Sequence, residues 1–364
     1  LFRLMCKRRG VKVIMLSNPK ISQKTLLSED DYKIDYIDDI SSIDCDIKTA
    51  KELELELQTL STKKSAADLW NKHGSNLTTQ KIKSLYQFMK SSNKNIKTNY
   101  NYYGRTKFKV LKNTIDLMLK KKYREFYMNK NFSHNPELST PYIYFPLSII
   151  LERNVLIGAP YYTNQVEVIR HIAKSVPVGY RILAKEHPIQ YSREWRSTHE
   201  YNEIMNIPNV TLIHGSFSDK KLLQNCSLVL SIAGSSGLEA AFYGKPSVVF
   251  ANVIYSYLPS VTKVDSIENL STIIRKSLIT KPNLHDVTKF MKILSENLID
   301  FDQNKFFAEF QARFTLNGAY IDSKINEHEM EIFLNEKKHT LEILCNAHID
   351  KIKQHKAYLT NSYK

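Results

Sequence analysis

The chain has 364 residues, enough for two domains of ordinary size, and Lys and Arg exceed Asp and Glu by 52 to 37, a net charge of +15. Such an excess favours a polyanionic partner, namely nucleic acid, an acidic membrane surface or a phosphorylated substrate. The four cysteines show no CxxC or CxxxC spacing, and no uninterrupted apolar run approaches the roughly 20 residues that span a bilayer. We therefore expect no zinc site, no disulfide framework and no membrane-spanning helix, in a reducing cytoplasm.

The first 140 residues contain an opening strand, an acidic stretch and a helical stretch. "LFRLMCKRRGVKVIML" predicts a helix end, a turn at Gly10 and a buried strand, and a chain that opens inside such a unit is expected to have lost residues upstream. Residues 28–56 predict a loop and then a helix, with a solvated acidic face rather than a metal site. Residues 61–130 predict helices; "TKFKVLKNTIDLMLKKKYREFYMNK" is a basic amphipathic stretch that suits a surface helix with one packed face, a membrane surface or a polyanion.

From residue 141 onward, short apolar strands alternate with helices. The expected strands are "YIYFPL", "RILAKEH", "VTLIHG", "SLVLSIAG" and "PSVVFA", with helices around 163–175, near Asp219 and from Ser236. Alternation with short connections predicts a doubly wound α/β domain with a parallel sheet. Residues 266–364 predict several helices, the last of them long, charged and amphipathic.

Two of these strands end in polar residues, and ligands of a parallel sheet bind at the carboxyl ends of its strands. Lys185, Glu186 and His187 end one strand, and "GSSG" at residues 234–237 follows another. Gly234 and Gly237 can let backbone amides approach an anion, and the serine hydroxyls between them can donate to phosphate oxygens. The alternatives are a charged strand terminus and an ordinary capped turn. The spacing fits neither a Walker loop nor GxGxxG nor the GxSxG of a nucleophile elbow.

The order of four blocks over roughly residues 140–260 resembles the capsule polysaccharide biosynthesis family, which includes the Kdo transferases of capsule export systems. The blocks are "YIYFPLSIILERNV", "YYTNQVEVIRHIAKSVPVGYRILAKEHP", "NVTLIHG" and "SIAGSSGLEAAFYGKPSVVFAN". The resemblance implies a GT-B fold, in which two Rossmann-like domains face across a cleft. We accordingly expect a partial, truncated N-terminal acceptor-side domain with a helical insert at 1–140, a C-terminal nucleotide-sugar-binding domain at 141–300 and a helical C-terminal extension at 301–364.

The resemblance also implies roles for particular residues. His187 and Pro188 would form a His-Pro motif on the donor phosphate, and His187 would act in catalysis by stabilising charge on the leaving nucleotide. Glu152 is the weak candidate for the general base. The expected nucleotide-sugar-binding residues are Lys185, Glu186, His187, Pro188, Gly234, Ser235, Ser236, Gly237, Glu239, Arg153 and Gln165. The chain departs from the family pattern at Ser148, where a histidine is common, and at Ile150 and Leu151, where Gln-Pro is common.

The function implied by the resemblance is a metal-independent glycosyltransferase of capsule or surface polysaccharide synthesis. It would move a sugar, such as Kdo or another acidic sugar from a CMP donor, from a nucleotide sugar to a growing glycan or glycolipid, with no further cofactor. We expect it in the cytoplasm, peripheral at the inner face of the cytoplasmic membrane, where the net charge suits an anionic surface. The alternatives are a CDP-alcohol phosphotransferase of teichoic-acid type, a sugar-nucleotide epimerase, and a non-catalytic capsule assembly or export factor. A nucleic-acid partner is not expected, since "NYNYYGRTKFKV" is the one dense mixture of basic and aromatic residues.

Overall fold

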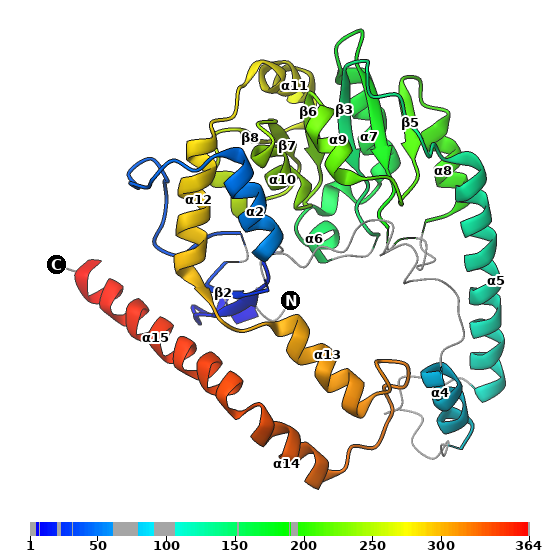
Figure 1. Ribbon diagram of the computed structural model, residues 1–364, viewed down its shortest axis with the longest axis vertical. Coiled ribbons are helices and arrows are strands. Elements are labelled where there is room, and N and C mark those ends of the chain that lie inside the picture. The colour runs from blue at the N-terminus through cyan, green and yellow to red at the C-terminus, as the bar shows by residue number, and fades with distance from the viewer. Residues whose placement is uncertain are drawn as a thin grey trace. The chain divides into compact units, whose positions relative to one another are not determined.

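The computed structural model describes residues 5–6, 8–19, 23–30, 32–60, 79–90, 106–150, 153–188, 190 and 196–362 (Figure 1). The chain forms two compact units. The sheet unit comprises Asp30–Gly74 and Lys120–Glu296, and the helical unit comprises Leu1–Glu29, Ser75–Leu119 and Asn297–Lys364.

A six-stranded parallel sheet forms the centre of the sheet unit, in the order β5-β4-β3-β6-β7-β8. The strands are β3 (Tyr142–Pro146), β4 (Arg181–Lys185), β5 (Val210–Ile213), β6 (Leu228–Ser231), β7 (Ser247–Val249) and β8 (Val261–Lys263). The chain runs from β3 outward to β5, returns to the other side of β3, and continues outward to β8. The predicted doubly wound α/β fold is therefore confirmed, and the strand order reverses between β3 and β6.

Helices cover both faces of this sheet (Figure 1). On one face, α7 (Gln165–Ser175), α8 (Thr198–Met205) and α11 (Leu270–Ile279) pack against strand residues that include Ile143 and Phe145. On the other face, α9 (Asp219–Asn225) and α10 (Ser236–Phe242) pack against Tyr142 and Tyr144. Successive strand residues thus enter opposite cores, which explains why these strands are apolar throughout rather than alternating.

The helices of the sheet unit begin at polar caps that the sequence supplies. Asn164 accepts from the Glu167 amide at the start of α7, and Ser218 accepts from the Lys221 amide at the start of α9. Ser197 and Glu200 form a reciprocal capping box at the start of α8, in which the Glu200 carboxylate accepts from the Ser197 amide at 2.7 Å. These caps fix where each helix leaves the carboxyl edge of the sheet.

The sheet unit also contains segments that the sequence places before residue 141. Helix α2 (Ala50–Leu60) contacts α10, and its Glu54 forms an ion pair with Lys220 of α9 and accepts from the hydroxyl of Tyr243 at the end of α10. The end of α5 (Lys107–Asn131) contributes Met128 to the core. The described residues between 30 and 60, and residues 120–140, are therefore grouped with the parallel sheet.

The helical unit contains residues from both ends of the chain. Its antiparallel sheet has the order β1-β2-β9, from β1 (Met15–Ser17), β2 (Thr25–Ser28) and β9 (Leu298–Ile299). The expected buried strand near residue 15 is present as β1, but it is only half-buried. The helices of this unit are α4 (Thr79–Lys90), the first part of α5, α13 (Gln303–Phe314), α14 (Glu327–Glu336) and α15 (Lys338–Ser362). The helical C-terminal tail is thus confirmed.

The remaining helices of the described residues are short or lie at the border of the sheet unit: α6 (Arg153–Leu156), α12 (Leu284–Asn297), and the 3-10 turns at Pro160–Tyr162, Ile254–Tyr257 and Ile267–Asn269. Within the described part of the chain, none of the helices has the length and apolar character that crossing a membrane requires.

Candidate functional site

The carboxyl ends of β3, β4 and β6 lie next to one another, because β3 is paired with β4 on one side and with β6 on the other. The two polar strand ends of the sequence, Lys185–His187 on β4 and residues 234–237 after β6, therefore flank the end of β3. This is the point where the strand order reverses, the usual ligand position in an open α/β sheet. The structure thus brings the two predicted motifs to one edge of the sheet.

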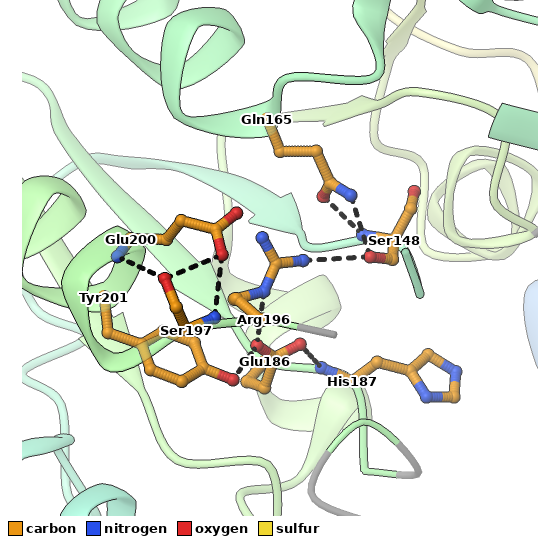
Figure 2. Close-up of polar contacts among 8 residues, drawn as sticks. All are labelled: Ser148, Gln165, Glu186, His187, Arg196, Ser197, Glu200 and Tyr201. Atoms are coloured by element: carbon orange, nitrogen blue, oxygen red, sulfur yellow. Dashed lines mark hydrogen bonds and ion pairs between the residues drawn. The ribbon is translucent and has the colours of Figure 1, made fainter. Parts of the chain in front are cut away.

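Glu186 does not face a ligand, contrary to its predicted role. Its side chain is fully buried, and its carboxylate forms an ion pair with Arg196 (Nε to Oε2, 2.9 Å) whose side chain is also fully buried. The carboxylate accepts further bonds from the Tyr201 hydroxyl (2.8 Å) and from the His187 amide (2.8 Å), as Figure 2 shows. A buried carboxylate with this many donors supports the surrounding structure.

Gln165 likewise turns to the protein rather than to a ligand. Its side-chain oxygen accepts from the Ser148 amide (2.8 Å) and its side-chain nitrogen donates to the Ser148 carbonyl (2.9 Å). Arg196 donates from Nη2 to the same carbonyl (3.0 Å), so its guanidinium links the β3 loop to Glu186 (Figure 2). These bonds hold the backbone of Ser148 directly after β3. Its half-buried side chain therefore lies at the point where the strand order reverses.

Lys185 is also occupied by a protein partner. Its buried ammonium lies 2.7 Å from Oδ1 of Asp219, the first residue of α9, and the Tyr144 hydroxyl donates to the same oxygen (2.8 Å). Burial acts to raise the pKa of Asp219, but Lys185 and Tyr144 outweigh it and hold that pKa below its ordinary value. The ion pair cancels most of the positive charge that Lys185 could offer a ligand as one of the expected nucleotide-sugar-binding residues.

His187, two residues after the end of β4, is the predicted residue of this motif that remains half-exposed. Its amide donates to Glu186, while Figure 2 shows its imidazole pointing away from the Glu186 cluster. It lies near enough to Asp219 to contribute to lowering the pKa of that carboxyl. Pro188 is buried beside it. The imidazole is therefore carried on a backbone that the Glu186–Arg196 pair makes rigid.

A second histidine lies at the end of the neighbouring strand β5. His214 is buried; its ring stacks on that of His134 (centroids 4.2 Å apart), and its Nδ1 lies 2.7 Å from the Ser216 hydroxyl. Burial, followed by the nearby His134 and Lys185, lowers the pKa of His214 to about 4. This imidazole is therefore neutral at physiological pH and adds no positive charge to the edge.

The loop after β6 is built from small residues for reasons of packing. A Cβ on Gly237 would lie 2.7 Å from the Tyr255 hydroxyl, and a Cβ on Gly234 would lie 2.9 Å from the Ser231 hydroxyl. Tyr255 in turn donates to the Gly234 carbonyl. Both glycines thus admit protein groups rather than a ligand, which corrects the predicted reason for them; neither has a positive φ.

The two serines of this loop differ. The Ser235 hydroxyl donates to the Glu239 carboxylate at 2.7 Å, so both predicted residues are engaged with each other. Ser236 begins α10 with a half-buried side chain for which the structure shows no polar partner among the described residues. Ser236 is therefore the hydroxyl of this loop that is available to an incoming group.

The remaining predicted residues are less informative. Arg153 is exposed at the start of α6 and has a partner of its own. Glu152, the candidate base, lies outside the described residues. Sequence reasoning missed Arg196, Tyr201, Asp219 and His214; the only signal for Arg196 was that a buried Glu186 would need a cation, and Asp219 follows the cap residue Ser218. Within the described residues, no group of three or more His, Cys, Asp or Glu side chains could hold a metal ion.

Comparison with known proteins agrees with this architecture. The family model described as "Capsule polysaccharide biosynthesis protein" matches residues 49–287, which is more than half of the chain. The sheet unit is thus an α/β domain with a polar reversal point, and the chain belongs to the capsule polysaccharide biosynthesis family. No curated protein matches it.

Solved structures resemble the chain only in part. The beta Kdo 2,7 transferase of Thermosulfurimonas dismutans KpsC is 15% identical, with a TM-score of 0.31, over 48% of this chain and 53% of that one. Its beta Kdo 2,4 transferase is 12% identical, with a TM-score of 0.32, over 48% and 54%. The UDP-GlcNAc 2-epimerase of Methanocaldococcus jannaschii, solved with UDP-GlcNAc and UDP, is 16% identical, with a TM-score of 0.31, over 50% and 51%. The chain spans about half the length of these proteins.

Proposed function

We propose that this protein is a glycosyltransferase of capsule or surface polysaccharide synthesis that uses a nucleotide sugar and acts at the cytoplasmic face of the membrane. The observation that carries the proposal is that half-buried polar side chains from two strand ends meet at the reversal point of the sheet. The imidazole of His187 and the hydroxyl of Ser236 come from the strand ends on either side of β3. The protein charges around them are paired.

In this proposal, the bond between the anomeric carbon of the sugar and the phosphate oxygen of the nucleotide breaks, and the nucleotide leaves with the electron pair. His187 and Ser236 donate hydrogen bonds to that phosphate and stabilise the charge that develops on it. A protonated His187 would supply the positive charge that Lys185 does not. We expect these donors to act without a metal ion, and a CMP-activated acidic sugar such as Kdo is the proposed donor.

The acceptor hydroxyl must lose a proton as it attacks the anomeric carbon. Glu152 remains our candidate for this base; it precedes the exposed Arg153 at the start of α6. The expected effect of Glu152→Gln is loss of turnover with nucleotide binding retained. Ser236→Ala, in contrast, is expected to weaken nucleotide binding.

Thermal unfolding with CMP, CDP, UDP, GDP and ADP tests the proposal. A nucleotide at about 100 times its dissociation constant should stabilise the fold by roughly 2.7 kcal/mol, which raises Tm by a few degrees. We expect one nucleotide to do so, with loss of the shift in His187→Ala and Ser236→Ala. Ser235→Ala is the matched control, because its hydroxyl is already bonded to Glu239. A wild-type protein that no nucleotide stabilises would refute the proposal.

Position 148 favours one alternative. The family's common histidine is replaced by Ser148, whose backbone is held in place by Gln165 and Arg196. If the missing imidazole is needed for transfer, the protein binds nucleotide without turning it over and serves as a non-catalytic capsule factor. Ser148→His then separates the two functions: restored turnover identifies the non-catalytic case, whereas turnover already present in the wild type identifies the transferase.

A further inference from the structure

Helix α4 of the helical unit exposes an apolar stripe. Ile82, Leu85, Tyr86 and Met89 follow the spacing i, i+3, i+4, i+7, and each is between 49% and 67% exposed. In a globular protein this spacing marks the side of a helix that is buried in the core. Here α4 is attached through other residues: Phe88 packs with Tyr320, and the Ser84 hydroxyl donates to the Ala319 carbonyl (2.7 Å).

The first part of α5, in the same unit, repeats this feature. Phe108, Ile115 and Leu119 are spaced by seven and four residues and so share one side of the helix. Their exposed fractions are 78%, 58% and 62%. The two helices are joined by a bond from the Lys107 ammonium to the Met89 carbonyl (2.6 Å). Two neighbouring helices of one unit therefore present large apolar side chains to the outside.

The charges beside these stripes are basic. Helix α4 contains Lys81, Lys83 and Lys90 and no carboxylate, so its net charge is +3. By helical geometry, Lys81 lies at one border of the stripe and the other two lysines lie at the opposite border. The first part of α5 adds Lys107, Lys109 and Lys112 against a single acid, Asp116. An apolar stripe bordered by lysines is the surface that lies in the interface of an anionic bilayer.

We propose that the surface formed by Ile82, Leu85, Tyr86 and Met89 of α4, with Phe108, Ile115 and Leu119 of α5, binds an anionic lipid bilayer. The apolar side chains enter the boundary between headgroups and acyl chains, and the lysines meet the lipid phosphates. A second copy of the chain fits less well, because a two-fold contact through α4 would oppose lysine to lysine with no carboxylate on the helix. The proposal gives a physical basis to the membrane location within the proposed function, and it holds whether or not the sheet unit transfers a sugar.

Co-sedimentation with phosphatidylcholine vesicles, with and without phosphatidylglycerol, tests this surface. We expect binding to vesicles that contain phosphatidylglycerol and a fall in binding as salt is raised. Leu85→Ser/Tyr86→Ser should weaken binding by at least about tenfold, since two large apolar side chains no longer enter the bilayer. Lys83→Gln and Lys90→Gln should each weaken it by about fivefold.

The matched control is Val178→Ser/Ile279→Ser, which removes two apolar side chains of the sheet unit that are more exposed than Leu85 and Tyr86, and it should leave vesicle binding unchanged. Nucleotide-dependent thermal shifts of the same variants separate this proposal from the transferase proposal, because a surface variant should keep them. The bilayer proposal is overturned if the wild type ignores anionic vesicles, or if Leu85→Ser/Tyr86→Ser binds them as well as the wild type. A dimer in light scattering that this variant abolishes, without vesicle binding, would assign the surface to a second copy instead.

Discussion

The strand ends of β4 and β6 flank the same point of the sheet, yet they use their polar residues in opposite ways. At the end of β4, Lys185 and Glu186 are buried and paired with Asp219 and Arg196. At the end of β6, the polar groups are hydroxyls, and Ser236 remains available. The more highly charged motif of the sequence thus contributes mainly support, and the less charged one carries the hydroxyl that we propose contacts a ligand.

The difference follows from what burial costs. When a strand is covered on both faces, its end is buried as well. A charged side chain at that end must therefore be paired with an opposite charge or become neutral. A hydroxyl can stay half-buried at little cost and still donate a hydrogen bond. We infer that ionisable residues directly after a buried strand should first be examined for protein partners, and that the residue one step further along, here His187, is the better candidate for a ligand.

The largest expected effect tests the support role of β4. Arg196→Met leaves the Glu186 carboxylate buried without its cation, and it also removes the bond to the Ser148 carbonyl. We expect the free energy of unfolding to fall by about 3–5 kcal/mol. Urea unfolding followed by circular dichroism measures this. Arg170→Met, which breaks exposed ion pairs with Glu167 and Glu203, should cost no more than about 1 kcal/mol. If the two variants lost equal free energy of unfolding, the buried Glu186–Arg196 pair would have no greater structural role than an exposed ion pair.

The next effect concerns pH and the neighbouring strand end at His214. The pKa of His214 in the folded protein is about 4, below the ordinary value of 6.5. Between pH 6.5 and pH 4, His214 is therefore protonated in the unfolded chain but neutral in the folded protein. Stability from this group is complete above about pH 6.5 and is lost as pH falls towards 4, by at most about 3 kcal/mol. His214→Asn should therefore lose less stability than the wild type over that range. Parallel slopes for the two proteins would contradict the buried, neutral histidine.

A smaller effect tests whether the glycines after β6 serve packing. Gly237→Ala places a methyl group 2.7 Å from the hydroxyl of Tyr255, a rigid ring that is also held by the Gly234 carbonyl. We expect a loss of about 1–3 kcal/mol in thermal unfolding. Gly234→Ala should cost less, because the Ser231 hydroxyl that it meets can rotate. If Gly237→Ala were neutral in stability and reduced only nucleotide binding, the glycine would belong to the ligand site after all.

Much of the sheet unit could be predicted from the sequence, because apolar strands such as "RILA" and "LVLS" alternate with capped helices over short connections. Several short or nonlocal elements could not be predicted from the sequence. Strands β2, β8 and β9 were not predicted, and β2 and β9 pair across more than 270 residues of chain, a contact that no local pattern encodes. Helix α2 also contacts the sheet unit through the ion pair of Glu54 with Lys220, which is equally nonlocal.

The same reasoning explains the outcome at the candidate site. The position of His187 and Ser236 at one edge of the sheet follows from the parallel arrangement of the strands, which the alternation predicts. Which side chains face inward does not, because it depends on partners distant in sequence: Glu186 meets Arg196 and Tyr201, and Lys185 meets Asp219. A list of polar residues at a strand end therefore overstates the ligand contacts until those partners are known.

The smallest effect on stability that we predict is that of Ser236→Ala, which tests the ligand contact proposed for the end of β6. Ser236→Ala removes a hydroxyl without a protein partner among the described residues, so the stability of the free protein should hardly change. A hydrogen bond to a charged phosphate is worth about 1.5–3 kcal/mol, and the nucleotide dissociation constant should rise by roughly tenfold or more in calorimetric titration. Ser235→Ala breaks the bond to Glu239 instead, and it should cost about 1 kcal/mol of stability with little change in nucleotide affinity. If Ser235→Ala weakened the nucleotide as much as Ser236→Ala, the ligand would have to displace Glu239 on binding, and the β6 end would resemble the β4 end in having its polar groups paired beforehand.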